Sequence, residues 1–235
     1  DLFSGIGGFA LAAQAVGWQT IGFCEIDPYC QRVLRRHWPD VPIYDDVRTL
    51  SGNAVGHVDI ITGGFPCQDI SWAGPGDGIG GKRSGLWGEY GRIIGEIRPR
   101  LVVVENVAAL LSRGMGVVCG DLARIGYDAE WSTVSACSVG APHMRPRVFI
   151  VAYPNGVYGR SGFWNTAVQK DWTIQAVDDL KSSRINWRAR LANPSELYGG
   201  ADGLPNGPHR NRGIGNAIVP KVAETIFRGI AAPDY

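Results

Sequence analysis

A cysteine follows a proline in the stretch GGFPCQDIS, which spans residues 63–71. The stretch has no helix or strand pattern of its own, and the residues before it, HVDIITGG, are typical of a buried strand that ends in glycines. A thiolate is a strong nucleophile even when only a small fraction of the thiol is ionised. Cys67 is therefore a candidate nucleophile. The alternative is an inert, buried cysteine that acts as a small hydrophobic side chain.

An acid and two arginines accompany other apolar runs of the chain. Glu105 stands near the end of RLVVVEN (100–106). A cysteine beside an acid suits nucleophilic attack with delivery of a proton to the substrate. Arg145 and Arg147 flank a proline at the start of RVFIVAY (147–153), where two guanidinium groups could hold a phosphate, a base or the acid. They could also be ordinary surface arginines.

A glycine turn, FSGIGG at residues 3–8, precedes the helical pattern GFALAAQAVG. Glycines at such a turn let a ligand approach the backbone and the start of the helix. Glu25 follows about 20 residues later, where an acid can accept hydrogen bonds from ribose hydroxyls. The turn lacks the G-x-G-x-x-G pattern of proteins that bind nicotinamide cofactors. The turn and Glu25 together therefore indicate another nucleoside-containing cofactor. A plain tight turn beside a surface acid would leave the same pattern.

Short apolar runs alternate with helical patterns over the first 150 residues. QTIGFCE (19–25) and the three runs already named are predicted strands, and YCQRVLRRHW (29–38) is a predicted amphipathic helix ended by Pro39. Continuously apolar strands separated by helices indicate a doubly wound α/β fold with a mostly parallel sheet covered on both faces. Ligands bind at the carboxyl ends of such strands, so the glycines, acids and cysteine above should converge on one edge.

The composition of the 235 residues narrows the class of protein. With 45% hydrophobic residues, the chain can form one core or one core with a small appendage. No apolar run approaches the roughly 20 residues that span a membrane, and no signal-peptide pattern is seen. Five cysteines without a C-x-x-C pair argue against a disulfide framework or a metal site and favour a reducing cytosol. The chain opens inside the motif DLFSGIGGF, at Asp1, so we expect that residues of a first strand precede it.

Positive charge is concentrated in one part of the chain, although the net charge is only +1. Residues 1–144 carry eleven Lys and Arg against fifteen Asp and Glu, whereas residues 145–212 carry ten against five. Such a surplus fits a patch that contacts phosphates, or a solvated arginine-rich loop. Regular pattern is lost from Pro154 and returns as a helix at 217–230. We therefore expect a catalytic and cofactor-binding domain at 1–153, a recognition region at 154–195 and a returning segment at 196–235.

Five ordered motifs, DLFSGIGGF, GGFPCQDIS, VVVENV, RPRVFIVA and GIGNAIVP, resemble the DNA (cytosine-5)-methyltransferase family. The resemblance implies a fold of the S-adenosylmethionine-dependent methyltransferase type and transfer of a methyl group to C5 of a cytosine flipped out of duplex DNA. It implies that Cys67 is the nucleophile that attacks C6 and Glu105 the acid that contacts the base. It also implies that Arg145 and Arg147 are active-site arginines.

The same resemblance implies S-adenosylmethionine as the cofactor and no metal. Glu25 would hold the ribose, Ile26 would stack on the adenine and Asp46 would accept from the adenine amino group. The other implied cofactor contacts are Phe3, Gly5, Gly7 and Gly8 in the first turn, Gly64, Pro66 and Leu86 beside the methionine, and Asn216, Ala217 and Ile218 from the C-terminal return.

Two other activities remain open from the sequence. An RNA cytosine-5 methyltransferase would use the same motifs, although the Cys-Phe-Thr signature of the tRNA-acting relatives is absent. A non-catalytic, DNA-binding relative would account for the short recognition region. For the enzyme itself we expect a monomer in the cytoplasm of a prokaryotic or phage-infected cell. It would act on double-stranded DNA without a membrane, and a restriction endonuclease is its expected functional partner. The loop at 68–85, which has six glycines, is expected to close over the DNA.

Overall fold

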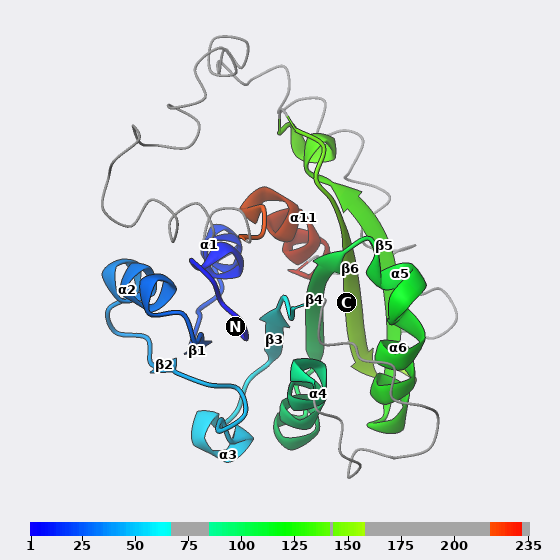
Figure 1. Cartoon of the computed structure of the whole chain (residues 1–235), viewed down its shortest axis with the longest axis horizontal. Coiled ribbons are helices and arrows are strands. Elements are labelled where there is room, and N and C mark those ends of the chain that lie inside the picture. The colour runs from blue at the N-terminus through cyan, green and yellow to red at the C-terminus, as the bar shows by residue number, and fades with distance from the viewer. Residues whose placement is uncertain (67–84, 142, 158–216, 232–235) are drawn as a thin grey trace.

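A parallel sheet with one reversed strand forms the centre of the molecule (Figure 1). The computed structural model describes residues 1–66, 85–141, 143–157 and 217–231. Strands β1 (Phe23–Cys24) and β2 (Ile43–Tyr44) pair in parallel, as do β3 (Ile60–Gly63) and β4 (Leu101–Val107). Leu2 bridges Cys24 on one side and Gly63 on the other, so the two pairs belong to one surface.

Strand β6 (Pro146–Pro154) runs antiparallel to both of its neighbours, β4 and β5 (Tyr127–Ser135). The run at 147–153 was predicted as a further parallel strand; the strand forms, but the predicted direction is wrong. β5 precedes β6 and is joined to it by a short connection, residues 136–145, whose described part contains the 3₁₀ helix η2 (Ala136–Val139). A parallel pair needs a crossover of a dozen or more residues, so this connection returns the chain as a hairpin.

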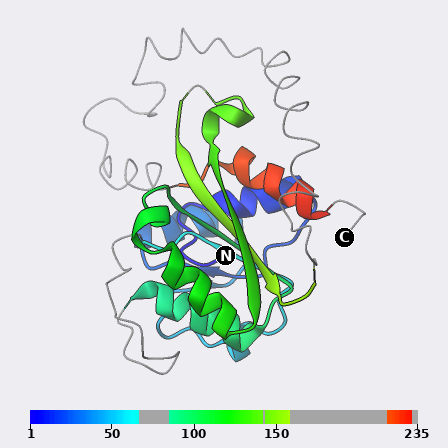
Figure 2. The same cartoon turned by 90° about the vertical axis from the view of Figure 1, so that its right-hand side faces the viewer.

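Helices cover both faces of the sheet (Figure 2). One face packs against α4 (Leu86–Ile97) and α6 (Met115–Arg124), and the other against α1 (Gly8–Ala15) and α11 (Pro220–Ala231). Successive side chains of β4 point to opposite faces of the sheet. Val102 and Val104 belong to the core cluster with α4 and α6, and Val103 belongs to the cluster with α1 and α11. This double burial explains why the first four residues of β4 are all apolar, and it confirms the predicted fold class.

The predicted helix after the first strand forms as α2 (Pro28–His37). Asp27 caps it, because its Oδ1 accepts hydrogen bonds from the backbone N–H groups of Tyr29, at 2.7 Å, and Cys30. Pro28 occupies the first turn, where a missing N–H is no loss. Three basic residues in the last turn complement the helix dipole. Leu34 of this helix packs on Phe23 of β1 and Ala10 of α1.

The remaining elements depart from the sequence pattern in two ways. Strand β1 covers only two of the seven residues predicted at 19–25. β5 was not predicted, because its sequence YDAEWSTVS mixes polar and apolar residues as a partly exposed strand does. The two short helices are α3 (Gly52–Val55) and α5 (Leu110–Arg113). None of the described helices is long and apolar enough to cross a membrane.

Candidate active site

Glu105 and Arg147 form an ion pair where β4 and β6 lie side by side, with Arg147 Nε 3.0 Å from Glu105 Oε1. Because β6 is antiparallel to β4, its beginning meets the carboxyl end of β4, and Arg147 lies opposite Val107. Arg145, two residues earlier, donates from Nη2 to the carbonyl oxygen of Ala217 at 3.0 Å. Its Nε is buried and has no hydrogen-bond partner among the described residues. Four candidate residues from three distant motifs, Glu105, the two arginines and Ala217, therefore meet at one edge.

Burial sets the protonation of this cluster. Removal from water raises the pKa of Glu105, and the guanidinium groups of Arg147 and Arg145 counteract only part of that rise. Burial and the nearby charge of Arg147 lower the pKa of Arg145. The carboxyl group thus keeps a proton to higher pH than an exposed glutamate does. A protonated acid in this position can donate a hydrogen bond to a ring nitrogen.

The chain that leads toward Cys67 passes directly against Glu105. A Cβ atom at Gly64 would lie 2.8 Å from Glu105 Oε2, so only glycine permits this approach. The buried Asn106 donates from Nδ2 to the carbonyl oxygen of Phe65 at 2.9 Å and so fixes the residue before Pro66. Cys67 itself lies outside the described residues. No role was predicted for Asn106, because a bond across 41 positions leaves no local pattern in the sequence.

The glycine turn and Glu25 are joined directly. The backbone N–H of Gly5 donates to Glu25 Oε2 at 2.7 Å, and that of Asp27 donates to Oε1 at 2.8 Å. Phe3, Gly5 and Gly7 all have positive φ angles, of 53°, 54° and 88°. Phe3 is one of two non-glycine residues with such a backbone among those described, a conformation that is kept where the surroundings enforce it. The turn thus holds the carboxylate at the end of β1.

The residues that follow β1 and β2 provide an apolar surface and a carboxylate. Ile26 is 63% exposed, which is unusual for a large apolar side chain next to a buried strand. Both oxygens of Asp46 accept hydrogen bonds from the guanidinium of Arg48, at 2.6–2.9 Å. Those bonds lower the pKa of Asp46 and keep it ionised. An adenine amino group would have to share the Asp46 carboxylate with the Arg48 guanidinium or displace the Arg48 side chain, which is 60% exposed.

The C-terminal return reaches the same edge. A Cβ atom at Gly8 would lie 2.2 Å from Ile218 Cγ2, so Ile218 sits directly on the first residue of α1. Ala217 receives the hydrogen bond from Arg145 described above. Leu86 begins α4 and is partly buried against the core. Asn216 lies outside the described residues. The described candidates thus lie in the first turn, at the carboxyl ends of β1 to β4, at the start of β6, at the start of α4 and on the C-terminal return.

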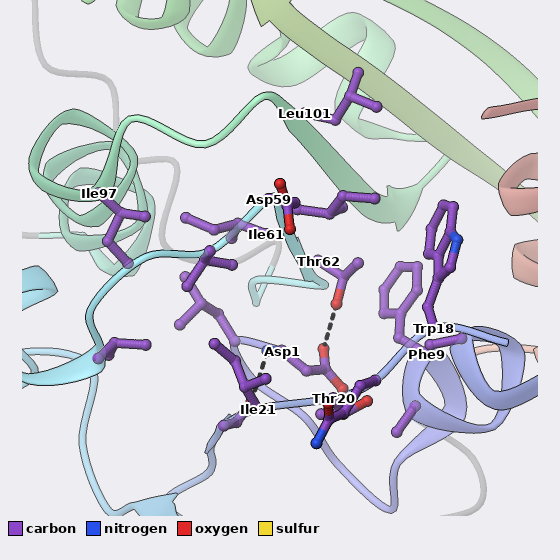
Figure 3. A pocket seen from close by; sticks show the side chains of 18 of the residues that line it. Asp1, Phe9, Trp18, Thr20, Ile21, Asp59, Ile61, Thr62, Ile97 and Leu101 are labelled. Atoms are coloured by element: carbon purple, nitrogen blue, oxygen red, sulfur yellow. Dashed lines mark hydrogen bonds between the residues drawn. The ribbon is translucent and has the colours of Figure 1, made fainter. Parts of the chain in front are cut away.

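A large cavity lies at the opposite edge of the sheet (Figure 3). Its volume is about 670 Å³, and its lining includes Asp59 and Ile60 at the start of β3, Leu101 at the start of β4 and Ile21 before β1. These are the amino ends of the strands, and neither Glu25 nor Glu105 lines it. We therefore assign the candidate site to the carboxyl edge, where ligands bind in open α/β sheets, and not to this cavity.

Within the described part of the chain, the buried Cys24 is not a candidate nucleophile. Cys24, which lies within the strand predicted at 19–25, is 3% exposed, and burial raises the pKa of its thiol to about 12. It therefore stays protonated at neutral pH. No group of three or more possible metal ligands occurs within residues 1–66, 85–141, 143–157 and 217–231.

Comparison with known proteins places these observations in a family. Residues 1–192 match the family model described as C-5 cytosine-specific DNA methylase. The Type II methyltransferase M2.BsuMI of Bacillus subtilis (strain 168) is 37% identical over 160 residues, which are 65% of this chain and 41% of that protein. M.HhaI of Haemophilus parahaemolyticus is 30% identical over 159 residues, 66% of this chain and 48% of that protein. The match thus spans less than half the length of each of these relatives.

Solved structures agree with the fold. A putative DNA modification methyltransferase encoded within a prophage of E. coli superposes with a TM-score of 0.53 at 26% identity, covering 66% of this chain and 45% of that one. The Entamoeba histolytica methyltransferase EhMeth gives a TM-score of 0.62 at 12% identity and covers 97% of this chain and 96% of that one, which speaks for the fold alone. The chain belongs to the C-5 cytosine-specific DNA methylase family.

Proposed function

We propose that this protein transfers a methyl group from S-adenosylmethionine to C5 of cytosine in duplex DNA. The observation that carries the proposal is the meeting of the Glu105–Arg147 pair with the segment at Gly64 that leads into Cys67. The glycine turn, whose Gly5 donates to Glu25, lies at the same edge of the sheet. Leu2, just before the turn, bridges Cys24 next to Glu25 and Gly63 next to Gly64. Family membership supports the reading of these residues as one active site.

The described residues fit a nucleoside cofactor. Glu25 presents a carboxylate to ribose hydroxyls, and the exposed Ile26 offers an apolar face to an adenine ring. Asp46 offers an ionised acceptor, and the close contact of Ile218 with Gly8 bounds the site from the C-terminal side. When bound, S-adenosylmethionine supplies an electrophilic methyl group on a sulfonium. The other proposed contacts with the cofactor are made by Phe3, Gly5, Gly7, Gly64, Pro66, Leu86, Asn216 and Ala217.

In the proposed reaction Cys67 Sγ attacks C6 of cytosine, and the electron pair of the C5–C6 double bond makes C5 nucleophilic. Glu105 donates to N3, where negative charge develops, and its raised pKa favours the protonated form that this requires. Once the methyl group is on C5, a solvent base removes the C5 proton. The electron pair of the C5–H bond then re-forms the C5–C6 double bond as the Cys67 thiolate leaves C6. Arg145 and Arg147 grip the nucleotide. A stacked base cannot be reached this way, so the cytosine must be flipped out.

The wider assignments follow from the same proposal. Residues 154–195, most of which lie outside the described residues, would recognise the target sequence. We propose that the enzyme acts as a monomer in the cytoplasm, on DNA rather than RNA. The relatives are named Type II methyltransferases, so a partner restriction endonuclease is part of the proposal.

The test is methylation of a mixed-sequence duplex by the wild-type protein and by Cys67→Ser, read by bisulfite sequencing. We expect the wild type to protect cytosines in one short motif and the serine variant to protect none. Calorimetry with S-adenosylhomocysteine should show equal binding by both proteins, because Cys67 acts on the base. Methylation by the serine variant at a rate near wild type would refute the mechanism. Methylation of RNA but not of duplex DNA would refute the substrate.

A further inference from the structure

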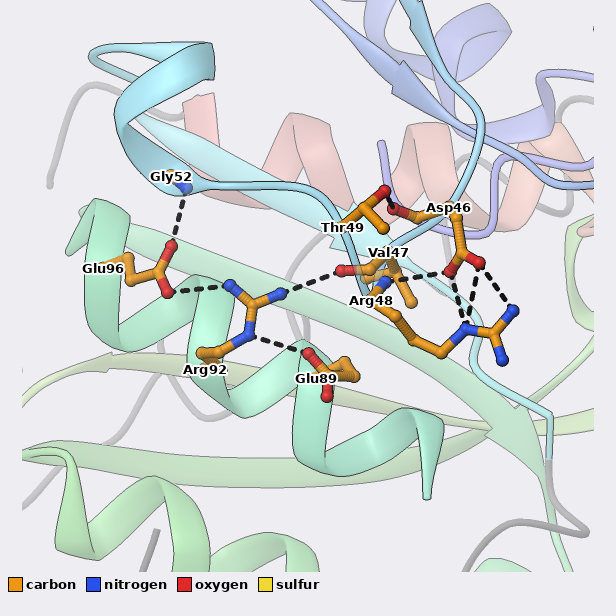
Figure 4. Close-up of polar contacts among 8 residues, drawn as sticks. All are labelled: Asp46, Val47, Arg48, Thr49, Gly52, Glu89, Arg92 and Glu96. Atoms are coloured by element: carbon orange, nitrogen blue, oxygen red, sulfur yellow. Dashed lines mark hydrogen bonds and ion pairs between the residues drawn. The ribbon is translucent and has the colours of Figure 1, made fainter. Parts of the chain in front are cut away.

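Arg92 of α4 reaches across to the segment that follows β2 (Figure 4). Its Nη2 donates to the carbonyl oxygen of Val47 at 2.9 Å, between residues 45 positions apart. Val47 is 4% exposed and belongs to the same core cluster as Tyr90 and Ile93 of α4. This guanidinium therefore connects a helix with the residue next to Asp46, the proposed acceptor for adenine.

Two carboxylates hold Arg92 in this direction. Glu89 accepts from Nε and Glu96 from Nη1, each at 2.7 Å, so the guanidinium is bonded on three sides. Ion pairs of this spacing stabilise a helix only weakly. Their effect here is to orient the third bond, which leaves the helix. A lysine could not make all three bonds, because its single ammonium lacks the fork of the guanidinium.

The far end of the same segment is tied to the same helix. Glu96 Oε2 accepts from the backbone N–H of Gly52 at 2.7 Å. A Cβ atom at Gly52 would lie 2.7 Å from Glu96 Cβ and 2.9 Å from Ile97 Cγ1, so the backbone rests directly on α4. Asp46 comes directly before the first tie, and its carbonyl oxygen accepts from the backbone N–H groups of Thr49 and Leu50, which closes a tight turn. The turn that begins at Asp46 is thus tied to α4 at Val47 and at Gly52.

We propose that Arg92 is a positioning residue for the cofactor, which sets the place of the Asp46 carboxylate against the adenine ring through the Val47 carbonyl. Because α4 begins at Leu86, proposed beside the methionine, the same helix would hold both ends of the cofactor site. The inference rests on the proposed function. It adds a residue that touches neither cofactor nor base.

The test compares wild type, Arg92→Gln and Arg92→Lys in calorimetry with two ligands, S-adenosylhomocysteine and S-inosylhomocysteine. The second carries a 6-oxo group in place of the 6-amino group that Asp46 would accept from. We expect the wild type to prefer the adenine ligand, and Arg92→Gln to bind it about tenfold more weakly, the scale of one charged hydrogen bond. Its binding of the inosine ligand should change little. Arg92→Lys should fall between the two.

Arg124→Gln is the matched control, because Arg124 also pairs with a carboxylate three residues earlier on its helix, Asp121, but on α6. It should keep wild-type affinity and preference. In methylation assays Arg92→Gln should raise the KM for S-adenosylmethionine, with kcat and the KM for DNA within twofold of wild type. A general fault in folding would lower kcat as well.

The outcomes separate the inference from its basis. If the wild type binds neither ligand, the proposed cofactor is wrong and the inference falls with it. If the wild type prefers the adenine ligand and Arg92→Gln keeps both its affinity and its preference, only the inference is overturned. Equal weakening of both ligands would also overturn it, because that pattern indicates a general loss of structure. Should Arg92→Gln not fold, Arg92→Lys gives the same comparison.

Discussion

At the scale of single residues, the environment of Glu105 decides what its carboxyl group can do. Its side chain is 12% exposed and pairs with Arg147, yet burial outweighs the attraction of the two arginines and raises its pKa. An acid with a raised pKa favours the protonated state, in which it can donate rather than only accept. Asp46 shows the opposite case, because the bonds from Arg48 lower its pKa and keep it an acceptor. The two proposed roles therefore match the two environments.

The raised pKa predicts how stability depends on pH. Folded Glu105 binds its proton more tightly than the unfolded chain does, so its favourable contribution is complete below the unfolded pKa, about 4.3, and is lost as pH rises through the folded pKa. Glu105→Gln has no such proton. The Tm of wild type relative to Glu105→Gln should therefore fall as pH rises from about 4 and then level off. Scanning calorimetry at a series of pH values measures it, and a relative Tm that rises with pH would contradict the assignment.

At the scale of elements, the end of β4 holds the loop that leads to Cys67. Glu105 and Asn106 are consecutive residues of one strand, so their side chains leave on opposite sides of it. Glu105 lies against Gly64 and pairs with Arg147 of β6, while Asn106 bonds to the carbonyl oxygen of Phe65. The strand thus places an acid and fixes the approach of the loop through adjacent residues.

Gly64→Ala tests this arrangement. The added Cβ would stand 2.8 Å from Glu105 Oε2, so either the loop or the acid must shift. We expect a loss of stability of about 1–3 kcal/mol, as for other overpacked sites, together with a large fall in methylation. Denaturant unfolding and the bisulfite assay measure the two effects.

Gly91→Ala provides the comparison, because nothing lies within 4 Å of its added Cβ and the residue is within α4. Alanine there should stabilise the helix by up to about 1 kcal/mol and leave methylation unchanged. If Gly64→Ala behaved like Gly91→Ala, the close contact between loop and acid would not be needed for the reaction.

At the scale of the whole molecule, α11 links the C-terminal return to the first turn. Its buried residues Val222, Ile226 and Phe227 pack with Phe9 of α1 in one core cluster. The Phe227 ring lies 5.9 Å from that of Phe9 and 4.9 Å from that of Trp18, measured between centroids. The same return places Ile218 on Gly8 and Ala217 against Arg145. Packing of this helix therefore determines whether the site closes.

Phe227→Ala should lower the free energy of unfolding by about 3–5 kcal/mol, because it leaves a cavity in a fully buried cluster. Arg228→Ala, one residue along on the exposed side, should change it by less than about 0.5 kcal/mol. Urea unfolding followed by fluorescence measures both, and Trp18 reports on the cluster directly. Similar values for the two variants would show that α11 contributes little to the fold.

Local pattern in the sequence was enough to predict the α/β class, the helix at α2 and the glycine turn with Glu25. These features depend on residues close in sequence: the apolar run of β4, the Asp27 cap and the glycines that permit positive φ. Strand lengths were predicted less well, because β1 pairs with β2 over only two residues. Cys67, Asn216 and most of the recognition region lie outside the described residues, so their predicted roles stay predictions.

Only the tertiary structure decided which distant residues meet. The reversal of β6 brings Arg147 to Glu105, and its neighbour in the motif, Arg145, to Ala217. The bonds from Asn106 to Phe65 and from Arg92 to Val47 likewise join segments more than 40 positions apart. Contacts of this kind depend on strand direction and helix packing, which are properties of the assembled sheet. A sequence pattern records the periodicity of one element, and it holds no information on how two such elements are oriented.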